Sequence, residues 1–222
     1  MIYLGDLSSA DAALLAAAAR DTPSILEFGV GGSSQIFAQS APEHARITSL
    51  DTSADWIART ATILRAMDLE HRVLFRSYAD WAREPDRKCY DLLFDDGIDV
   101  LRLDFANRAW PLLRPGGKLI FHDTRRPRDW VNVLRFAAEH YLEIGAIEPN
   151  AAASNLSIIT KQRCQAYENW NVSEGRSPVM VGWGSMEETI AFVEDAVRGG
   201  HLVRDQQHEA RGLPHPPVAG SE

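Results

Sequence analysis

Short apolar runs alternate along the chain with longer segments in which apolar residues recur at helical spacing. Five of these runs predict β-strands, at residues 24–28, 46–50, 72–76, 90–94 and 117–122. A segment with helical periodicity follows each run. Strands that alternate with helices form βαβ units, so the pattern predicts an α/β fold with a doubly wound, Rossmann-like parallel sheet and helices on both faces.

The two ends of this pattern predict further elements. A helix begins near Ser8, because Asp11 stands three residues on in the spacing of a capping box, and it ends before Pro23. Two further apolar runs, residues 141–147 and 155–160, are joined by a turn-like stretch and not by a long helix. They predict an antiparallel hairpin at the edge of the sheet.

Composition and charge narrow the classes of partner. The 222 residues include 23 basic and 31 acidic residues, and the net charge of −8 gives no electrostatic basis for binding nucleic acid or an anionic membrane. No apolar run approaches the roughly 20 residues of a membrane span. The two cysteines, Cys89 and Cys164, indicate neither a disulfide framework nor a zinc cluster. We therefore expect a cytoplasmic protein without nucleic-acid or membrane partners.

Polar or glycine residues stand at the carboxyl ends of all five predicted strands. In open α/β sheets, ligands bind beyond these ends. The residues are Glu27 and Gly29, Asp51, Ser77 and Tyr78, Asp95 and Asp96, and Asp123. Their agreement over five strands is stronger evidence for a binding site than any single motif.

The segment "GVGGSS" after the first strand approximates the GxGxxG pattern, with Ser34 in place of the third glycine. Asp51 follows Gly31 by 20 residues, where a carboxylate can accept the ribose hydroxyls of a nucleoside. A plain strand-to-helix turn and a helix N-cap are the structural alternatives. Between a pyridine dinucleotide and S-adenosylmethionine (SAM), Glu27 favours SAM, because a carboxylate repels pyrophosphate and attracts an ammonium and a sulfonium.

Four segments, "ILEFGVGGSS", "SLD", "DLLFDDG" and "LLRPGGKLIFHD", together resemble class I SAM-dependent methyltransferases. The resemblance covers residues 20–160 and implies a seven-stranded sheet whose last strand is antiparallel. It also implies these roles: Glu27, Gly29, Gly31 and Ser33 line the methionine part, Asp51 binds the ribose, Ser77, Tyr78 and Ala79 border the adenine, and Asp95 or Asp96 lies near the methionine end or the transferred methyl group.

Within this class, "DLLFDDGID…PLLRPGGKLIFHD" looks most like the catechol-type and related small-molecule O-methyltransferases. Those that bind Mg²⁺ hold it after the fourth and fifth strands, which implies Asp96 and Asp123 as metal ligands here. Thr124 stands where the catechol-type pattern has Asn, and Asp99 stands where it has a basic residue. The sequence therefore leaves both a metal-assisted and a metal-free site open.

A metal-free site needs a general base for a hydroxyl acceptor. His122 is the nearest candidate, with a half-buried structural histidine as the alternative, so the catalytic candidates are Asp96, Asp123 and His122. Alternation along a strand predicts that His122 and Asp123 point to opposite faces.

Two groups of larger side chains have less specific interpretations. The arginines of the segment 123–130 suit either an anionic acceptor or a solvated loop. Trp56 and Trp110 recur at helical spacing with apolar residues, which predicts core positions.

The sequence thus favours a SAM-dependent methyltransferase acting on a small molecule, with oxygen as the expected acceptor atom. One alternative is an NAD-dependent oxidoreductase, which Glu27, Ser34 and the lack of a Tyr-x-x-x-Lys pair disfavour. Another is a non-catalytic binding protein with the methyltransferase fold. The expected domain spans residues 1–160. Residues 161–210 are expected to form a cap or a homodimer element, and residues 211–222 a disordered tail.

Overall fold

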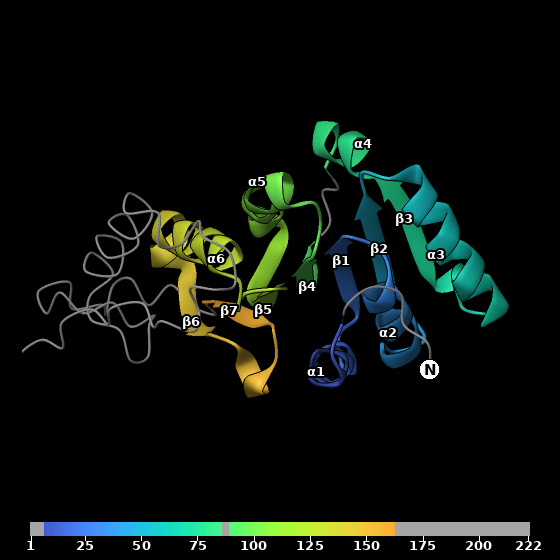
Figure 1. Ribbon diagram of the computed structural model, residues 1–222, viewed down its shortest axis with the longest axis horizontal. Coiled ribbons are helices and arrows are strands. Elements are labelled where there is room, and N and C mark those ends of the chain that lie inside the picture. Colours follow the sequence, from blue (N-terminus) through green and yellow to red (C-terminus); the bar gives the residue numbers. More distant parts are fainter. Residues whose placement is uncertain (1–6, 86–88, 163–222) are drawn as a thin grey trace, which may run out of the picture.

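The strands predicted from the sequence join one mixed sheet in the computed structural model, which describes residues 7–85 and 89–162 (Figure 1). The sheet has seven strands in the order β3-β2-β1-β4-β5-β7-β6. Their bounds are β1 Ser24–Phe28, β2 Arg46–Asp51, β3 Val73–Ser77, β4 Tyr90–Asp95, β5 Leu113–Phe121, β6 Ile144–Glu148 and β7 Ser157–Lys161. This confirms the fold class that the sequence predicts.

Strands β1 to β5 run parallel, whereas β7 is antiparallel to both of its neighbours, β5 and β6. The hairpin expected after the last long helix is therefore present, with its second strand inserted next to β5 and its first strand at the edge. β5 begins at Leu113 and ends at Phe121, so His122 and Asp123 lie beyond the strand.

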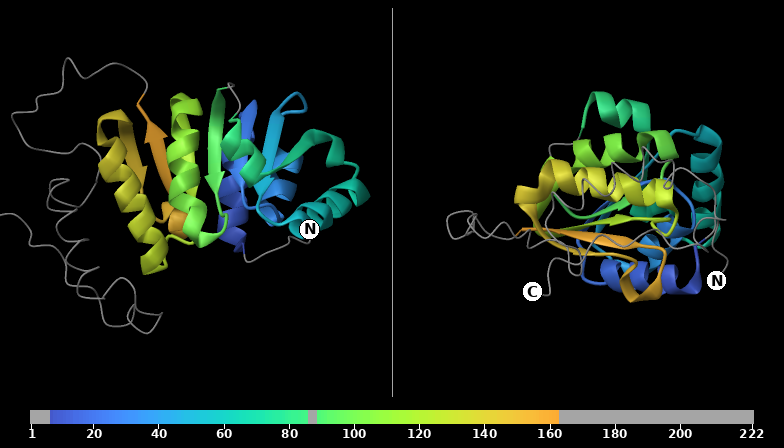
Figure 2. Two further views of the ribbon diagram at one scale, coloured as in Figure 1. Left: turned by 90° about the horizontal axis from the view of Figure 1, so that it is seen from above. Right: turned by 60° about the vertical axis from the view of Figure 1, so that its left-hand side comes forward.

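Helices cover both faces of the sheet (Figure 2). They are α1 Ser9–Ala19, α2 Gly32–Ser40, α3 Ala54–Ala66, α4 Tyr78–Arg83, α5 Asp99–Ala109 and α6 Pro127–His140, with short 3₁₀ turns at Glu70–Arg72, Trp110–Leu112, Tyr141–Glu143 and Ala151–Ala153. One buried cluster lies between the sheet and α1, α2 and α3, and the other between the sheet and α4, α5 and α6.

Alternation along β1 explains this division. Ile25 belongs to the cluster under α1 to α3, whereas Leu26 and Phe28 belong to the cluster under α4 to α6. All three side chains are almost wholly buried, and full burial of one such side chain contributes about 1.5–3 kcal/mol to stability. β1 is thus buried on both faces, as expected for a central parallel strand.

The predicted capping box begins α1. The Asp11 amide donates to Ser8 Oγ (3.1 Å), and the Ser8 amide donates to Asp11 Oδ2 (2.9 Å). Asp11 Oδ1 also accepts the amide of Asn155 (2.7 Å), which joins α1 to the loop before β7. The N-terminal helix is in this way fixed beside the carboxyl end of the sheet.

Two further expectations concern membrane spans and the C-terminal segment. Within residues 7–85 and 89–162, no helix has the length and apolar composition needed to span a membrane. The expected cap or dimer element and the disordered tail fall, apart from residues 161 and 162, outside the described residues.

Candidate active site

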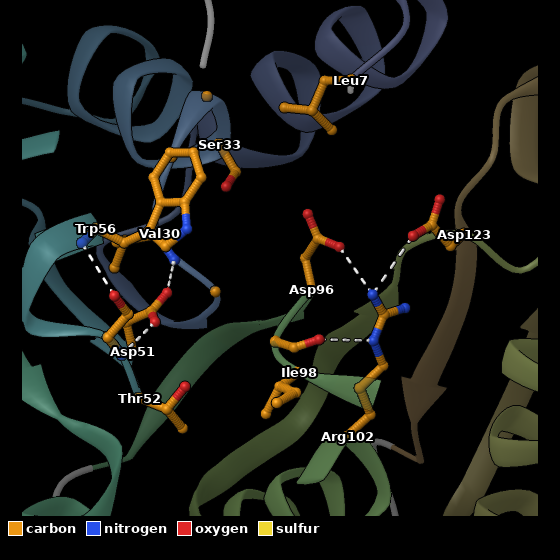
Figure 3. A pocket seen from close by; sticks show the side chains of 15 residues that line it. Leu7, Val30, Ser33, Asp51, Thr52, Trp56, Asp96, Ile98, Arg102 and Asp123 are labelled. Atoms are coloured by element: carbon orange, nitrogen blue, oxygen red, sulfur yellow. Dashed lines mark hydrogen bonds and ion pairs between the residues drawn. The ribbon is translucent and has the colours of Figure 1, made fainter. Parts of the chain in front are cut away.

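In the sheet, β2 and then β3 lie on one side of β1, whereas β4 and then β5 lie on its other side. The gap between the carboxyl ends of β1 and β4 is therefore the topological switch point, where open α/β sheets bind ligands. An open cavity of about 450 Å³ lies there (Figure 3). Its lining consists of Leu7, Gly29, Val30, Gly31, Gly32, Ser33, Asp51, Thr52, Ser53, Trp56, Asp96, Gly97, Ile98, Arg102 and Asp123.

The glycine-rich turn after β1 forms one wall of the cavity. Gly29 has φ +96°, and a Cβ there would lie 2.2 Å from the backbone oxygen of Asp96. Only glycine permits this conformation and this close approach without strain. Gly31 caps α2, and its amide donates to Ser34 Oγ (3.1 Å). The turn therefore presents backbone to the cavity and packs directly against the end of β4.

Glu27 lies behind this wall and does not line the cavity. Its carboxylate is fully buried and accepts the hydroxyls of Ser33, Ser34 (2.7 Å) and Ser49 (2.5 Å). Burial raises the pKa of Glu27 to about 7, against the opposing effect of the three serine hydroxyls. The sequence interpretation placed Glu27 against the ligand, whereas in the structure Ser33 lines the cavity and Glu27 holds Ser33 in place.

Asp51 lines the cavity from the end of β2. Its Oδ2 accepts the amide of Val30 (3.0 Å) and its Oδ1 accepts the amide of Ser53 (2.8 Å), so it joins the loops that follow β1 and β2. Each carboxylate oxygen has two lone pairs, and both oxygens therefore keep acceptor capacity. The half-buried Asp51 can accept further hydrogen bonds from hydroxyl groups of a ligand.

Trp56 and Thr52 complete this end of the cavity, and neither was a sequence candidate. The expectation that Trp56 belongs to the core is wrong, because it lies in the first turn of α3 and is 40% exposed. Trp110 is buried, as expected. The available signal for Trp56 was an aromatic residue in the first turn of the helix that follows Asp51.

The residues at the end of β3 and directly after it do not face the cavity. Ser77, Tyr78 and Ala79 do not line the cavity. Tyr78 is buried against Phe28, with ring centroids 4.3 Å apart, and its hydroxyl donates to Asp104 Oδ2 (2.6 Å). Asp95 is also outside the lining and fully buried, and burial raises its pKa well above its usual range.

The three catalytic candidates meet at the other end of the cavity. His122 Nδ1 lies 2.9 Å from Asp96 Oδ1 and 3.6 Å from Asp123 Oδ2. The prediction that His122 and Asp123 point to opposite faces is wrong, because both follow the end of β5 and Asp123 has φ +62°. His122 is fully buried, whereas Asp96 and Asp123 line the cavity.

Arg102 of α5 completes this cluster and was missed in the sequence. Its Nη2 lies 3.1 Å from Asp96 Oδ1 and 3.4 Å from Asp123 Oδ2 (Figure 3). Its Nη1 lies 3.4 Å from Asp129 Oδ1. The side chain is only 5% exposed. Its position three residues after Asp99 was the available signal, since an arginine on the buried side of a helix requires a partner.

The arginines of the segment 123–130 all contact acceptor groups within the protein. Arg126 forms ion pairs with Asp123 and Asp129. Arg128 pairs with Asp99 at 2.9 Å. Arg125 donates to the backbone oxygen of Ala153 at 2.6 Å. These arginines suggested an anionic substrate in the sequence, but in the structure carboxylates and a backbone oxygen of the protein already contact them.

Many solved structures share this arrangement of strands and helices. An O-methyltransferase from Bacillus cereus in complex with SAH has a TM-score of 0.59 at 17% identity, over 70% of this chain and 83% of the other. The O-methyltransferase TomG from Streptomyces achromogenes, in complex with SAM, has a TM-score of 0.58 at 18% identity, over 71% and 82%. A SAM-dependent O-methyltransferase from Thermotoga maritima has a TM-score of 0.59 at 18% identity, over 72% and 67%.

The chain has the methyltransferase fold. No family model matches its sequence, and no curated protein matches it either. The resemblance seen in four short segments is confirmed at the level of this methyltransferase fold, with its antiparallel strand beside β5. TM-scores of 0.59 and 0.58 over 70% and 71% of the chain show that the fold is shared, whereas identities of 17% and 18% show that most aligned residues differ.

Proposed function

We propose that the protein is a SAM-dependent methyltransferase that acts on a small molecule, at oxygen. The observation that carries this proposal is the cavity at the switch point, with Asp51 at one end and Asp96 beside Asp123 at the other. Two of the similar structures, both O-methyltransferases, hold SAM or SAH (S-adenosylhomocysteine). A cavity of about 450 Å³ falls in the range of small-molecule sites.

The charge of the lining favours SAM over a dinucleotide. Asp51, Asp96 and Asp123 face the cavity, and Arg102 is its only lining cation among the described residues. An acidic wall attracts the ammonium and sulfonium groups of SAM and repels a pyrophosphate. We assign the ribose to Asp51, the adenine to the side of Trp56, and the methionine part to the backbone of Gly29–Ser33.

Residues near Asp96 would carry the reaction. The bound donor supplies a methyl group on a positively charged sulfur. The acceptor oxygen forms its bond to the methyl carbon while the carbon–sulfur bond breaks, its electron pair stays on sulfur, and the hydroxyl proton passes to the Asp96 carboxylate. His122, with Nδ1 2.9 Å from Asp96 Oδ1, positions that carboxylate. Most of the rate would come from positioning and from fixed charges.

The residues at Asp96 and Asp123 do not fit a divalent cation, because the Arg102 guanidinium lies between the two carboxylates. The sequence left a metal-assisted reaction open, and the proposed mechanism uses no metal.

Calorimetric titration with SAM, SAH and NAD⁺ tests the proposal. We expect micromolar binding of SAM and SAH and no binding of NAD⁺. Asp51→Ala should weaken SAM binding at least tenfold, a loss of about 1.4 kcal/mol, because the ribose loses its acceptors. Asp55→Asn is the matched control, since Asp55 is exposed on the first turn of α3 and does not line the cavity. Thermal unfolding checks that each variant is folded.

Two outcomes would contradict the proposal. Binding of NAD⁺ without SAM would support the oxidoreductase alternative. If none of the three ligands binds, the glycine-rich segment is a structural turn between β1 and α2 with no role in ligand binding.

A further inference from the structure

A buried arginine occupies the centre of the acidic cluster at the ends of β4 and β5. The ligand atoms of Asp96, His122 and Asp123 all lie within 4.8 Å of one another, a spacing that suits a metal ion. The same cluster surrounds the Arg102 guanidinium, which is 3.1 Å from Asp96 and 3.4 Å from Asp123. A metal and this guanidinium would therefore compete for the same two carboxylates.

The backbone holds the guanidinium in this position. Its Nε donates to the oxygen of Gly97 (2.9 Å) and its Nη1 donates to the oxygen of His122 (3.0 Å). These two carbonyls follow β4 and β5, so the planar fork of arginine links both strand ends. The side chain is only 5% exposed and cannot turn into solvent without breaking these contacts.

The carboxylate oxygens near the guanidinium are also engaged by other groups. Asp96 Oδ1 is shared between Arg102 and His122 Nδ1. Asp123 Oδ2 pairs with both Arg102 and Arg126, and its Oδ1 accepts from Asn155 Nδ2 (3.3 Å). A divalent cation prefers several carboxylate and water oxygens. Here it would have to displace at least one positive side chain to reach them.

We infer that Arg102 takes the place of a divalent cation, so that this site binds no metal and Arg102 itself fixes Asp96 and Asp123 in orientation. Arg102 is in this sense a positioning residue. The role of Arg102 in orienting these carboxylates for the reaction rests on the proposed function. The inference that the site binds no metal does not depend on that function.

An arginine in place of a metal ion changes which methyl acceptors the site can bind. A metal accepts electron pairs and can chelate two neighbouring oxygens of an acceptor, whereas a guanidinium only donates hydrogen bonds. Arg102 therefore cannot form a chelate with a vicinal diol. The acceptor class expected here is a molecule with a single reacting hydroxyl beside Asp96.

Titration with Mn²⁺, followed by the electron paramagnetic resonance of the free ion, tests the inference directly. The wild-type protein should show no saturable binding. Arg102→Gln should gain saturable binding, at least tenfold tighter than the weak binding of exposed carboxylates, and Mn²⁺ should raise the unfolding temperature of this variant alone. Adding Asp123→Asn to Arg102→Gln should remove the gain. Arg108→Gln is the matched control, because Arg108 lies on the same helix and pairs with Asp104 at the surface.

Saturable Mn²⁺ binding to the wild type that is lost in Asp123→Asn would overturn the inference. A folded Arg102→Gln protein that gains no binding would also overturn it. If Arg102→Gln does not fold, the wild-type titration still decides, because it needs no variant. SAH titrations with EDTA and with Mg²⁺ run in parallel. A lack of SAH binding contradicts the proposed function alone, whereas Mn²⁺ binding contradicts the arginine inference alone.

Discussion

Strand-end carboxylates of this protein differ in their chemistry because they differ in burial. Asp51 is half-buried and lines the cavity, where its oxygens can meet a ligand. Glu27 is the last but one residue of the neighbouring strand β1 and is fully buried, and burial raises its pKa to about 7. Its role is structural, since it holds three serine hydroxyls from α2 and β2. A sequence position at a strand end thus does not by itself identify a ligand contact.

The raised pKa of Glu27 predicts a pH dependence of stability. The folded state keeps the proton up to about pH 7, whereas the unfolded chain loses it near the usual value of 4.5. The folded state therefore binds more protons in this window, and stability falls as pH rises from 4.5 to 7, by about 3 kcal/mol from this group. Urea unfolding across this range, compared with Glu27→Gln, measures the effect.

Glu27→Gln cannot titrate, so the difference between the two unfolding free energies should change through this window and level off above pH 7. Parallel curves for the two proteins would show that the pKa of Glu27 is not raised. The difference curve also cancels the contributions of other titrating groups, which both proteins share.

At the scale of elements, the turn from β1 to α2 depends on its contact with the end of β4. Gly29 has a left-handed backbone conformation and packs its α-carbon onto the Asp96 backbone. The amide of Asp96 in turn donates to the oxygen of Phe28 at 2.8 Å. The ends of β1 and β4 are therefore fixed to each other, and this contact places Asp96 opposite the glycine-rich turn.

Gly29→Ala should destabilise the protein by on the order of 2 kcal/mol or more, because the new Cβ meets backbone atoms in a conformation that L-residues avoid. Gly145→Ala on β6 is the control, since a Cβ there meets no atom closer than 3.4 Å. Its unfolding free energy should stay within about 0.5 kcal/mol of the wild type. Equal stability of the two variants in urea unfolding would contradict this account of the turn.

At the scale of the whole molecule, topology and charge act together. The cavity lies at the switch point between β1 and β4, and its acidic lining is part of an overall net charge of −8. Charges of one sign around a cleft raise the local concentration of a ligand of opposite charge. A ligand that carries a positive charge should therefore bind more weakly when salt screens the cavity.

SAM and SAH provide this comparison, because they differ by the charged sulfur and one methyl group. Raising NaCl from about 0.05 M to about 0.5 M should weaken SAM binding severalfold and SAH binding much less. Calorimetric titration at both salt concentrations measures the two ratios. An equal salt dependence for both ligands would show that the acidic lining does not act on the sulfonium.

The order of strands and helices, and the edge of the sheet that carries the cavity, follow from the sequence alone. Apolar runs between amphipathic segments predicted the strands of the sheet and the hairpin, because burial on both faces of a parallel strand requires continuous apolar residues. Polar residues at the strand ends predicted the edge of the sheet where the cavity lies, because parallel strands bring their carboxyl ends to one edge. Asp51, Asp96 and Asp123 were found in this way.

Which side chains face the cavity, and which support it from behind, depends on how the elements pack together in space. Glu27 lies behind Ser33, and Trp56 faces the cavity from the first turn of α3, because the packing of helices on the sheet sets their orientation. Arg102 is 21 residues from Asp123 in sequence and reaches it only because α5 packs beside the ends of β4 and β5. Local patterns carry no information about such contacts, since the contacts depend on how separate elements approach one another in space.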